Sequence, residues 1–178
     1  MKNTFRPILH VLVRLMLAVL LYLPFTACLN EDVCEDIATV PIRIGFAMRD
    51  TANAEPRSLA VDSLSIHGLD NPVLIYENRN NVSRVELPLH LAKDSVAFVL
   101  YIANPIEFLP YVADTLWLYY QRRPVLISMD CGFVTFFDLE RLAYSRNFID
   151  TVTIENTSII NNLDEHIKIF PFVAEPAP

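Results

Sequence analysis

The residue types that enzymes use for catalysis occur in this chain without the spacing of a catalytic motif. The glycines are too few for a phosphate-cradling loop, a dinucleotide-binding fingerprint or a nucleophile elbow: Gly45, Gly68 and Gly132. The histidines after residue 27 lack the i, i+4 spacing of a helical zinc site: His67, His90 and His166. Carboxylates are numerous, but no two stand out as the acid pair of a glycoside hydrolase. A carboxylate-dependent hydrolase is therefore the third of three hypotheses, and no metal or cofactor is expected.

The best candidate for a binding surface is a cluster of aromatic residues. On a β-strand, alternate side chains point to opposite faces, so Trp117 and Tyr119 share one face. Leu118 and Tyr120 take the other face, and Tyr111 lies shortly before the cluster. An outward-facing aromatic pair can stack on sugar rings or on a protein partner, whereas the alternative is that these rings belong to the core. Glycan binding through Trp117 and Tyr119 is therefore the second hypothesis.

The N-terminal segment has the features of a secretory signal peptide that ends before a lipidated cysteine. Its basic flank is followed by an apolar core, residues 15–23, that is shorter than the roughly 20 residues needed to span a bilayer. The small residues Thr26 and Ala27 precede Cys28, as a signal peptidase with a narrow pocket requires. We therefore expect residues 1–27 to be removed and Cys28 to be acylated. The alternative, a membrane anchor starting near Ile8, is opposed by Arg14 and Pro24.

An acidic segment, residues 28–38, follows the expected cleavage site. Its four carboxylates lie within eight positions of Cys28: Glu31, Asp32, Glu35 and Asp36. The segment resembles the acidic export signal behind the lipidated cysteine of many Bacteroidota surface lipoproteins, and a solvated tether is the alternative. Calcium binding is less favoured, because the spacing and the turn glycine of an EF-hand loop are missing.

Two further cysteines, Cys34 and Cys131, are expected to form a disulfide, because the compartment outside the inner membrane is oxidising. The bond would fasten the tether to the domain. Val125, Ile127 and Met129 share one parity with Cys131, which predicts that the disulfide lies on a buried face. Two free buried thiols are the alternative.

A short pattern of Asp, then Ser or Thr, then an apolar residue recurs along the chain. It resembles the acceptor motif of the general O-glycosylation system of Bacteroidota. The structural alternative is that Asp-Ser and Asp-Thr open turns into strands by bonding to the backbone. Both interpretations place the hydroxyl residues at strand starts: Thr51, Ser63, Ser95, Thr115 and Thr151.

Alternation of apolar and polar residues after position 38 predicts an all-β domain over residues 39–178. In its first strand Ile42, Ile44, Phe46 and Met48 point one way, and in a later strand Leu64 and Ile66 point inward. Only residues 139–144 suit a helical turn. The remaining strands are expected at 73–76, 82–89, 95–102, 115–121, 124–131, 132–137, 148–154 and 166–170. We expect a single β-sandwich, immunoglobulin-like or of related topology, with a small closed barrel as the competitor.

The charge of the mature chain argues against nucleic acid as a partner. The leader holds three of the 14 basic residues and none of the 21 acidic ones, so the mature chain is strongly acidic. Such a surface repels phosphate backbones, and no Lys/Arg stripe interleaved with aromatics is visible in the sequence.

Several stretches, in order along the chain, resemble an uncharacterised family of small Bacteroidota lipoproteins that contain a domain of unknown function. They are residues 31–34, 39–46, 85–89, 130–133 and 165–169. The resemblance implies a lipid-anchored β domain with paired cysteines and carries over no catalytic residue. The first hypothesis is therefore a non-catalytic structural or interaction module, lipid-anchored at the bacterial outer membrane and facing the periplasm or the cell surface. Its partner is expected to be an envelope protein or a glycan.

Overall fold

The computed structural model describes residues 14–16, 40–49, 55–103, 111–129 and 132–172. The chain divides into two units, Met1–Asp36 and Ile37–Pro178. In the first unit the described residues, 14–16, are helical. Across the described ranges, no helix combines the length and the apolar character needed to cross a membrane.

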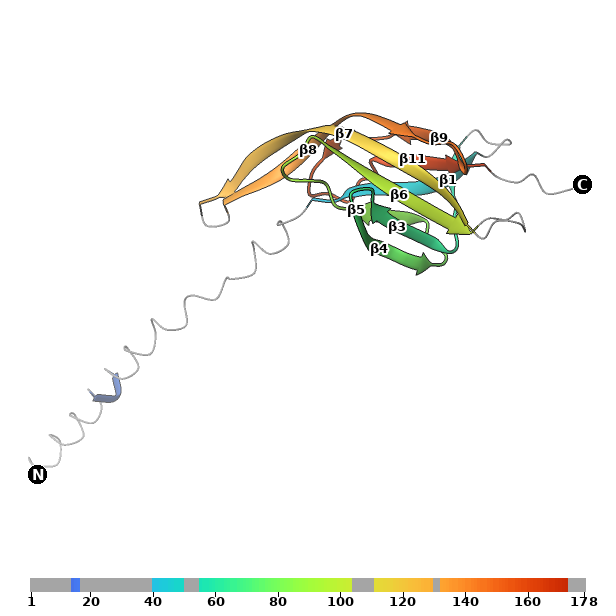
Figure 1. Ribbon diagram of the computed structural model, residues 1–178. Coiled ribbons are helices and arrows are strands. Elements are labelled where there is room, and N and C mark those ends of the chain that lie inside the picture. Colours follow the sequence, from blue (N-terminus) through green and yellow to red (C-terminus); the bar gives the residue numbers. More distant parts are fainter. Residues whose placement is uncertain (1–13, 17–39, 50–54, 104–110, 130–131, 173–178) are drawn as a thin grey trace, which may run out of the picture. The chain divides into compact units, whose positions relative to one another are not determined.

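The second unit is built from β-strands connected by turns and loops (Figure 1). Its described residues form β1 (Ile42–Arg49), β2 (Pro56–Ser58), β3 (Leu64–Gly68), β4 (Asn71–Arg79), β5 (Arg84–Leu87), β6 (Ser95–Ala103), β7 (Tyr111–Ser128), β8 (Gly132–Tyr144), β9 (Ile149–Ile154), β10 (Ser158–Ile159) and β11 (Ile167–Pro171).

These strands form two open sheets, which confirms the predicted sandwich. One sheet has the order β2-β1-β11-β9, and β5 also pairs with β1. The other has the order β10-β8-β7-β6-β3-β4. β1 and β11 run parallel, with Ile44 opposite Ile167, whereas the pairs β6–β7 and β7–β8 are antiparallel. Because both sheets are open, the closed barrel is excluded.

Alternate side chains of both sheets meet in one core. Ile42 and Ile44 of β1 are fully buried, as are Leu64 and Ile66 of β3 and Leu118 of β7, so the predicted inward positions of these strands are confirmed. The ring of Tyr120 packs edge-on against Phe137, with 5.2 Å between ring centroids. Its hydroxyl accepts a hydrogen bond from the His90 backbone N–H at 2.8 Å, and burial raises the pKa of this phenol.

The predicted helical turn at residues 139–144 is wrong, because this segment is part of β8. A β-bulge explains the misleading pattern: Tyr119 lies opposite Arg141 and Tyr120 opposite Leu139, so Glu140 is an extra residue. The bulge places Leu139 and Leu142 on the same side at a spacing of three, which imitates helical periodicity.

The bounds of other predicted strands also need correction. The segments predicted as separate strands at 115–121 and 124–131 are joined in one long strand, β7, which includes Pro124 and ends at Ser128. Within the strand predicted at 82–89, Arg84–Leu87 form β5, which pairs with β1. At the end of β4, Asn78 and Asn81 have φ values of 43° and 57°, a backbone conformation that asparagine tolerates.

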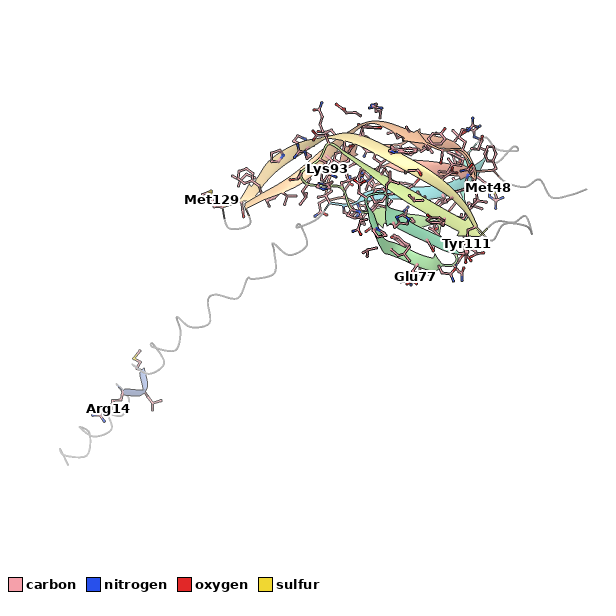
Figure 2. The ribbon with its side chains drawn as sticks, in the orientation of Figure 1. Arg14, Met48, Glu77, Lys93, Tyr111 and Met129 are labelled. Atoms are coloured by element: carbon pink, nitrogen blue, oxygen red, sulfur yellow. The ribbon has the colours of Figure 1, made fainter. Side chains whose placement is uncertain are left out.

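The long β7–β8 hairpin extends beyond the rest of the sandwich, and Met129 marks its outer end (Figures 1 and 2). In the part of the chain that the structure describes, no second sheet covers it there, and Ile127 and Met129 are 37% and 90% exposed. The argument that placed the face of Val125, Ile127 and Met129 in the core is therefore wrong. Cys131, for which this parity was used, lies outside the described residues.

Candidate functional site

Trp117 occupies an open position on the outward face of the six-stranded sheet. Leu116 and Leu118, its neighbours along β7, are fully buried, whereas Trp117 is partly exposed. Its cross-strand neighbours are Ala97 on β6 and Ala143 on β8. Because a methyl group is the only side chain on either side, the indole has no large neighbour opposite it on either adjacent strand.

Tyr119 lies two residues further along the same face and is paired with a cation. Its cross-strand neighbours are Ser95 on β6 and Arg141 on β8. The guanidinium of Arg141 lies over the Tyr119 ring, 3.6 Å from the ring centroid, which is a close cation–π contact. We call the set Trp117, Tyr119 and Arg141 the aromatic platform.

A second aromatic pair shares this face of the sheet. His67 of β3 and Tyr101 of β6 stack with ring centroids 5.6 Å apart and an interplanar angle of 27°. Both rings are partly exposed. The His67 imidazole is held through Nδ1, which lies 2.7 Å from the carbonyl oxygen of Gly68. These rings share the face of Trp117 but are displaced along the strands, because Tyr101 lies opposite Ala113, four residues before Trp117.

The structure separates Tyr111 from the other aromatic residues predicted to bind a ligand. Tyr111 shares the parity of Trp117 and is 54% exposed, but it is the first residue of β7. Six residues of extended strand separate the two by roughly 20 Å. Figure 2 shows Tyr111 and Met129 at opposite ends of the long strand and its turn. Tyr111 is therefore not part of the aromatic platform.

Asp114 forms a buried clamp that sequence reasoning missed. Only 1% exposed, its carboxylate accepts hydrogen bonds from the backbone N–H groups of Asn147, Phe148 and Ile149 at 2.8–3.0 Å. The Ser145 hydroxyl donates to the same carboxylate. Asp114 thereby fixes the turn that leads from β8 to β9.

The other described aspartates of the Asp-Ser and Asp-Thr pattern also have structural partners. Asp62 accepts a hydrogen bond from the Asn81 N–H, and Asp94 and Asp150 form ion pairs with arginines. Ser63 immediately precedes β3, Ser95 begins β6 and Thr151 lies near the start of β9, as predicted, but Thr115 is inside β7. Thr51 lies outside the described residues.

His166, which directly precedes β11, is fully buried. Its Nδ1 accepts a hydrogen bond from the Arg43 backbone N–H at 3.0 Å, and its Nε2 has no partner among the described residues. Nδ1 must therefore be unprotonated in this arrangement. Burial lowers the pKa of this imidazole, and the nearby Arg43 charge adds to the effect, opposed by Asp164.

The depressed pKa of His166 predicts a loss of stability at acidic pH. The imidazole binds a proton more readily in the unfolded chain than in the folded one. The stabilisation that neutral His166 contributes is therefore complete above about pH 6.5 and decreases as the pH falls below that value. The expected slope is at most about 1.4 kcal/mol per pH unit. Urea unfolding between pH 7.5 and 5 measures it, and His166→Asn, whose amide oxygen can replace Nδ1 as the acceptor, is expected to flatten the dependence.

A matched control for this prediction is His90→Asn, because His90 is exposed. This variant is expected to keep the pH dependence of the unmodified chain. An equal loss of stability in the His166→Asn variant and the unmodified chain over the same pH range would contradict the assignment.

Two cavities lie away from the aromatic platform. One of about 580 Å³ is lined by Ser58, Ser83, Arg84, Glu165 and Lys168 together with Phe46, Ala47 and Pro56. The Glu165 carboxylate lies over Gly45, where any side chain would collide with it, and it pairs with Arg84 and Lys168. A second, apolar cavity of about 320 Å³ contains one carboxylate, Glu86. Neither cavity has two acids facing each other.

Among the described residues, no group of three or more His, Cys, Asp and Glu is placed to hold a metal ion.

Cys28 is the residue expected to be acylated, and Cys34 and Cys131 are expected to form a disulfide. All three lie outside the described residues. Acylation of Cys28 and pairing of Cys34 with Cys131 therefore stay predictions.

Comparison with known protein families gives a match for this chain. The model of a family of unknown function (DUF6452) matches residues 63–171, which include β3 to β11 and therefore the whole aromatic platform. The chain belongs to this family. No match was found among curated proteins or among solved structures. The expected membership of an uncharacterised family is thus confirmed, whereas the bacterial group and the lipid anchor stay predictions.

Membership of DUF6452 brings no assigned site, so the platform rests on its geometry. The sequence predicted the shared face of Trp117 and Tyr119. It did not predict Arg141 or the His67–Tyr101 pair, because their positions depend on strand register. The one signal available was the alternation within residues 95–102, which puts Ala97 and Tyr101 on a common face.

Proposed function

We propose that this member of DUF6452 is a lipid-anchored envelope protein whose β-sandwich is a non-catalytic carbohydrate-binding module. The observation that carries the proposal is the position of Trp117, which faces outward between two alanines and beside the arginine-capped ring of Tyr119. The second hypothesis from the sequence required that these rings not be buried in the core, and both are partly exposed.

The platform suits the chemistry of a sugar ring. The C–H groups on one face of a pyranose are apolar and carry partial positive charge, which matches the negative face of an aromatic ring. The hydroxyl groups at the sugar's edge need polar partners, and the guanidinium of Arg141 supplies N–H donors on the same face. The rings sit on a hydrogen-bonded sheet, so little conformational entropy is lost on binding.

The proposal includes a location at the cell envelope. Cleavage before Cys28 and its acylation would hold the module at the outer membrane by the segment 28–38, and a bond between Cys34 and Cys131 would fasten that segment to the domain. The Asp-Ser and Asp-Thr sites are proposed as O-glycosylation acceptors. The mass of the protein from its native membrane, with and without reduction, tests these modifications together, and an unmodified chain starting at Met1 contradicts them.

Binding of the mature lipoprotein in detergent to a panel of neutral and acidic oligosaccharides tests the carbohydrate proposal. Trp117→Ala is expected to weaken binding roughly 10- to 100-fold, because each 1.4 kcal/mol of lost stacking is a factor of ten. Tyr111→Ala is the matched control, since it removes an exposed ring from the same strand face roughly 20 Å away. Binding to no member of the panel, or equal effects of the two substitutions, would overturn the proposal.

An envelope protein is the second candidate partner, favoured by a different feature. The outer end of the β7–β8 hairpin exposes large apolar side chains of the kind that protein interfaces bury: Leu126, Ile127, Met129 and Phe133. In the carbohydrate assay, a Met129→Ser variant is expected to bind like the unmodified protein.

A further inference from the structure

We infer that the carbohydrate bound by the platform is acidic and that Arg141 recognises its carboxylate. The inference rests on the proposed carbohydrate-binding function and adds the class of ligand. It is carried by the placement of one arginine, which is held by an aromatic ring instead of by an acid.

Five described arginines of the sandwich, at positions 43, 84, 122, 123 and 146, each form an ion pair with an aspartate or glutamate. Among the described residues, Arg141 belongs with those that form none, as does Arg49, which lies over the Phe170 ring, but Arg141 is the one placed diagonally to Trp117. Within the described ranges, Arg141 has no carboxylate oxygen within ion-pair distance, and its recorded partner is the Tyr119 ring. The adjacent acid, Glu140, accepts a hydrogen bond from the Gln121 amide at 2.6 Å. The charge of Arg141 is therefore not neutralised by a described neighbour.

The cation–π contact orients the guanidinium without using its N–H groups as donors to an acid. Arginine presents these donors in a planar fork that matches the two oxygens of a carboxylate. Because Tyr119 already restricts the side chain, less rotamer entropy is lost when the fork binds. A carboxylate is thus the group that best satisfies the open position.

The spacing places such a carboxylate beside a stacked sugar. Trp117 lies opposite Ala143, and Arg141 is two residues from Ala143 on the same strand, so Trp117 and Arg141 are diagonal neighbours. Diagonal pairs in an antiparallel sheet are about 7–8 Å apart. A sugar stacked on Trp117 and an acidic group on it or on the next sugar can therefore contact both side chains.

The net charge of the chain is negative, which does not favour acidic ligands in general. The chain has 21 acidic and 14 basic residues, so it does not attract polyanions as a whole. Preference for an acidic ligand must then come from a particular cation, and it should be lost when that cation is removed.

The test compares acidic oligosaccharides with their methyl esters, which keep the same sugar backbone and lose the charge. The panel contains uronate and sialate oligosaccharides and the mature lipoprotein is used throughout. The free acid is expected to bind at least about tenfold more tightly than its ester, the difference that 1.4 kcal/mol of charge-assisted bonding gives. Arg141→Gln is expected to abolish the preference, so that acid and ester bind equally, and Arg141→Lys is expected to retain part of it.

Arg123→Gln is the matched control, because Arg123 lies on the same strand pair but is paired with Asp138. It is expected to leave the preference unchanged. Equal binding of acid and ester, or a preference that survives Arg141→Gln, would overturn this inference while leaving the carbohydrate function standing. Absence of binding to every sugar would overturn the carbohydrate function and the inference with it.

Discussion

Replacing Asp114 by alanine is expected to lower the free energy of unfolding by about 3–5 kcal/mol. The substitution removes the acceptor of three backbone N–H groups, those of Asn147, Phe148 and Ile149. Each buried donor left without a partner costs about 1–3 kcal/mol. The Ser145 hydroxyl, which also donates to Asp114, loses its acceptor as well. Urea or guanidinium unfolding monitored by the fluorescence of Trp117 gives the free energy directly.

Two variants show whether the clamp is responsible for this loss. Asp114→Asn keeps one oxygen that can accept hydrogen bonds, but its NH₂ group faces backbone N–H groups that are also donors. An intermediate loss of stability is therefore expected. Asp94→Asn is the matched control, because Asp94 belongs to the same Asp-Ser/Thr pattern but pairs at the surface with Arg122. Its cost is expected to be below about 1 kcal/mol. Equal stabilities of the Asp94→Asn and Asp114→Ala variants would refute the clamp.

Replacing Leu118 by alanine is expected to cost about 3–5 kcal/mol of stability. Leu118 is fully buried in the core between the sheets and lies opposite Leu142 on β8 and Val96 on β6. Truncation removes its transfer free energy and leaves a cavity in the packed core. Unfolding of the variant by denaturant measures the loss. An unchanged slope of the unfolding free energy against denaturant concentration would show that the same surface is exposed on unfolding.

Trp117, the residue before Leu118, is expected to contribute less to stability. Trp117→Ala removes a larger side chain, but this ring is partly exposed and faces away from the core, so a smaller loss than for Leu118→Ala is expected. The two adjacent positions should thus separate stability from ligand binding. A Trp117→Ala variant that loses as much stability as Leu118→Ala would place the indole in the core and remove the basis of the platform.

The proposed platform depends on the pairing of two neighbouring strands. Its rings and its cation come from β7 and β8, which pair from one end of β8 to the other. The bulge at Glu140 shifts that register by one residue, so Arg141 lies opposite Tyr119 while Leu139 returns to the core side opposite Tyr120. A bulge beside a functional side chain is a recurring way to redirect it. Here it lets one strand serve both the core and the proposed site.

Local sequence determined the β character of this protein and the faces of its strands. Alternation with a period of two is a property of a few consecutive residues, so Trp117 and Tyr119 could be assigned to one face and Leu118 to the other without a fold. Where the sandwich does not extend, as at Ile127 and Met129, the same alternation gave the wrong environment. Parity sets the direction of a side chain, but burial requires a second layer opposite it.

Tertiary structure decided which residues meet across strands. The alanines beside Trp117, the guanidinium over Tyr119 and the turn held by Asp114 come from segments 20 to 35 residues away along the chain, and strand register and the Glu140 bulge bring them together. The burial of His166 likewise depends on the parallel pairing of β1 with β11. Such contacts leave no local periodicity in the sequence, because register is fixed by the packing of whole sheets and the closure of long loops.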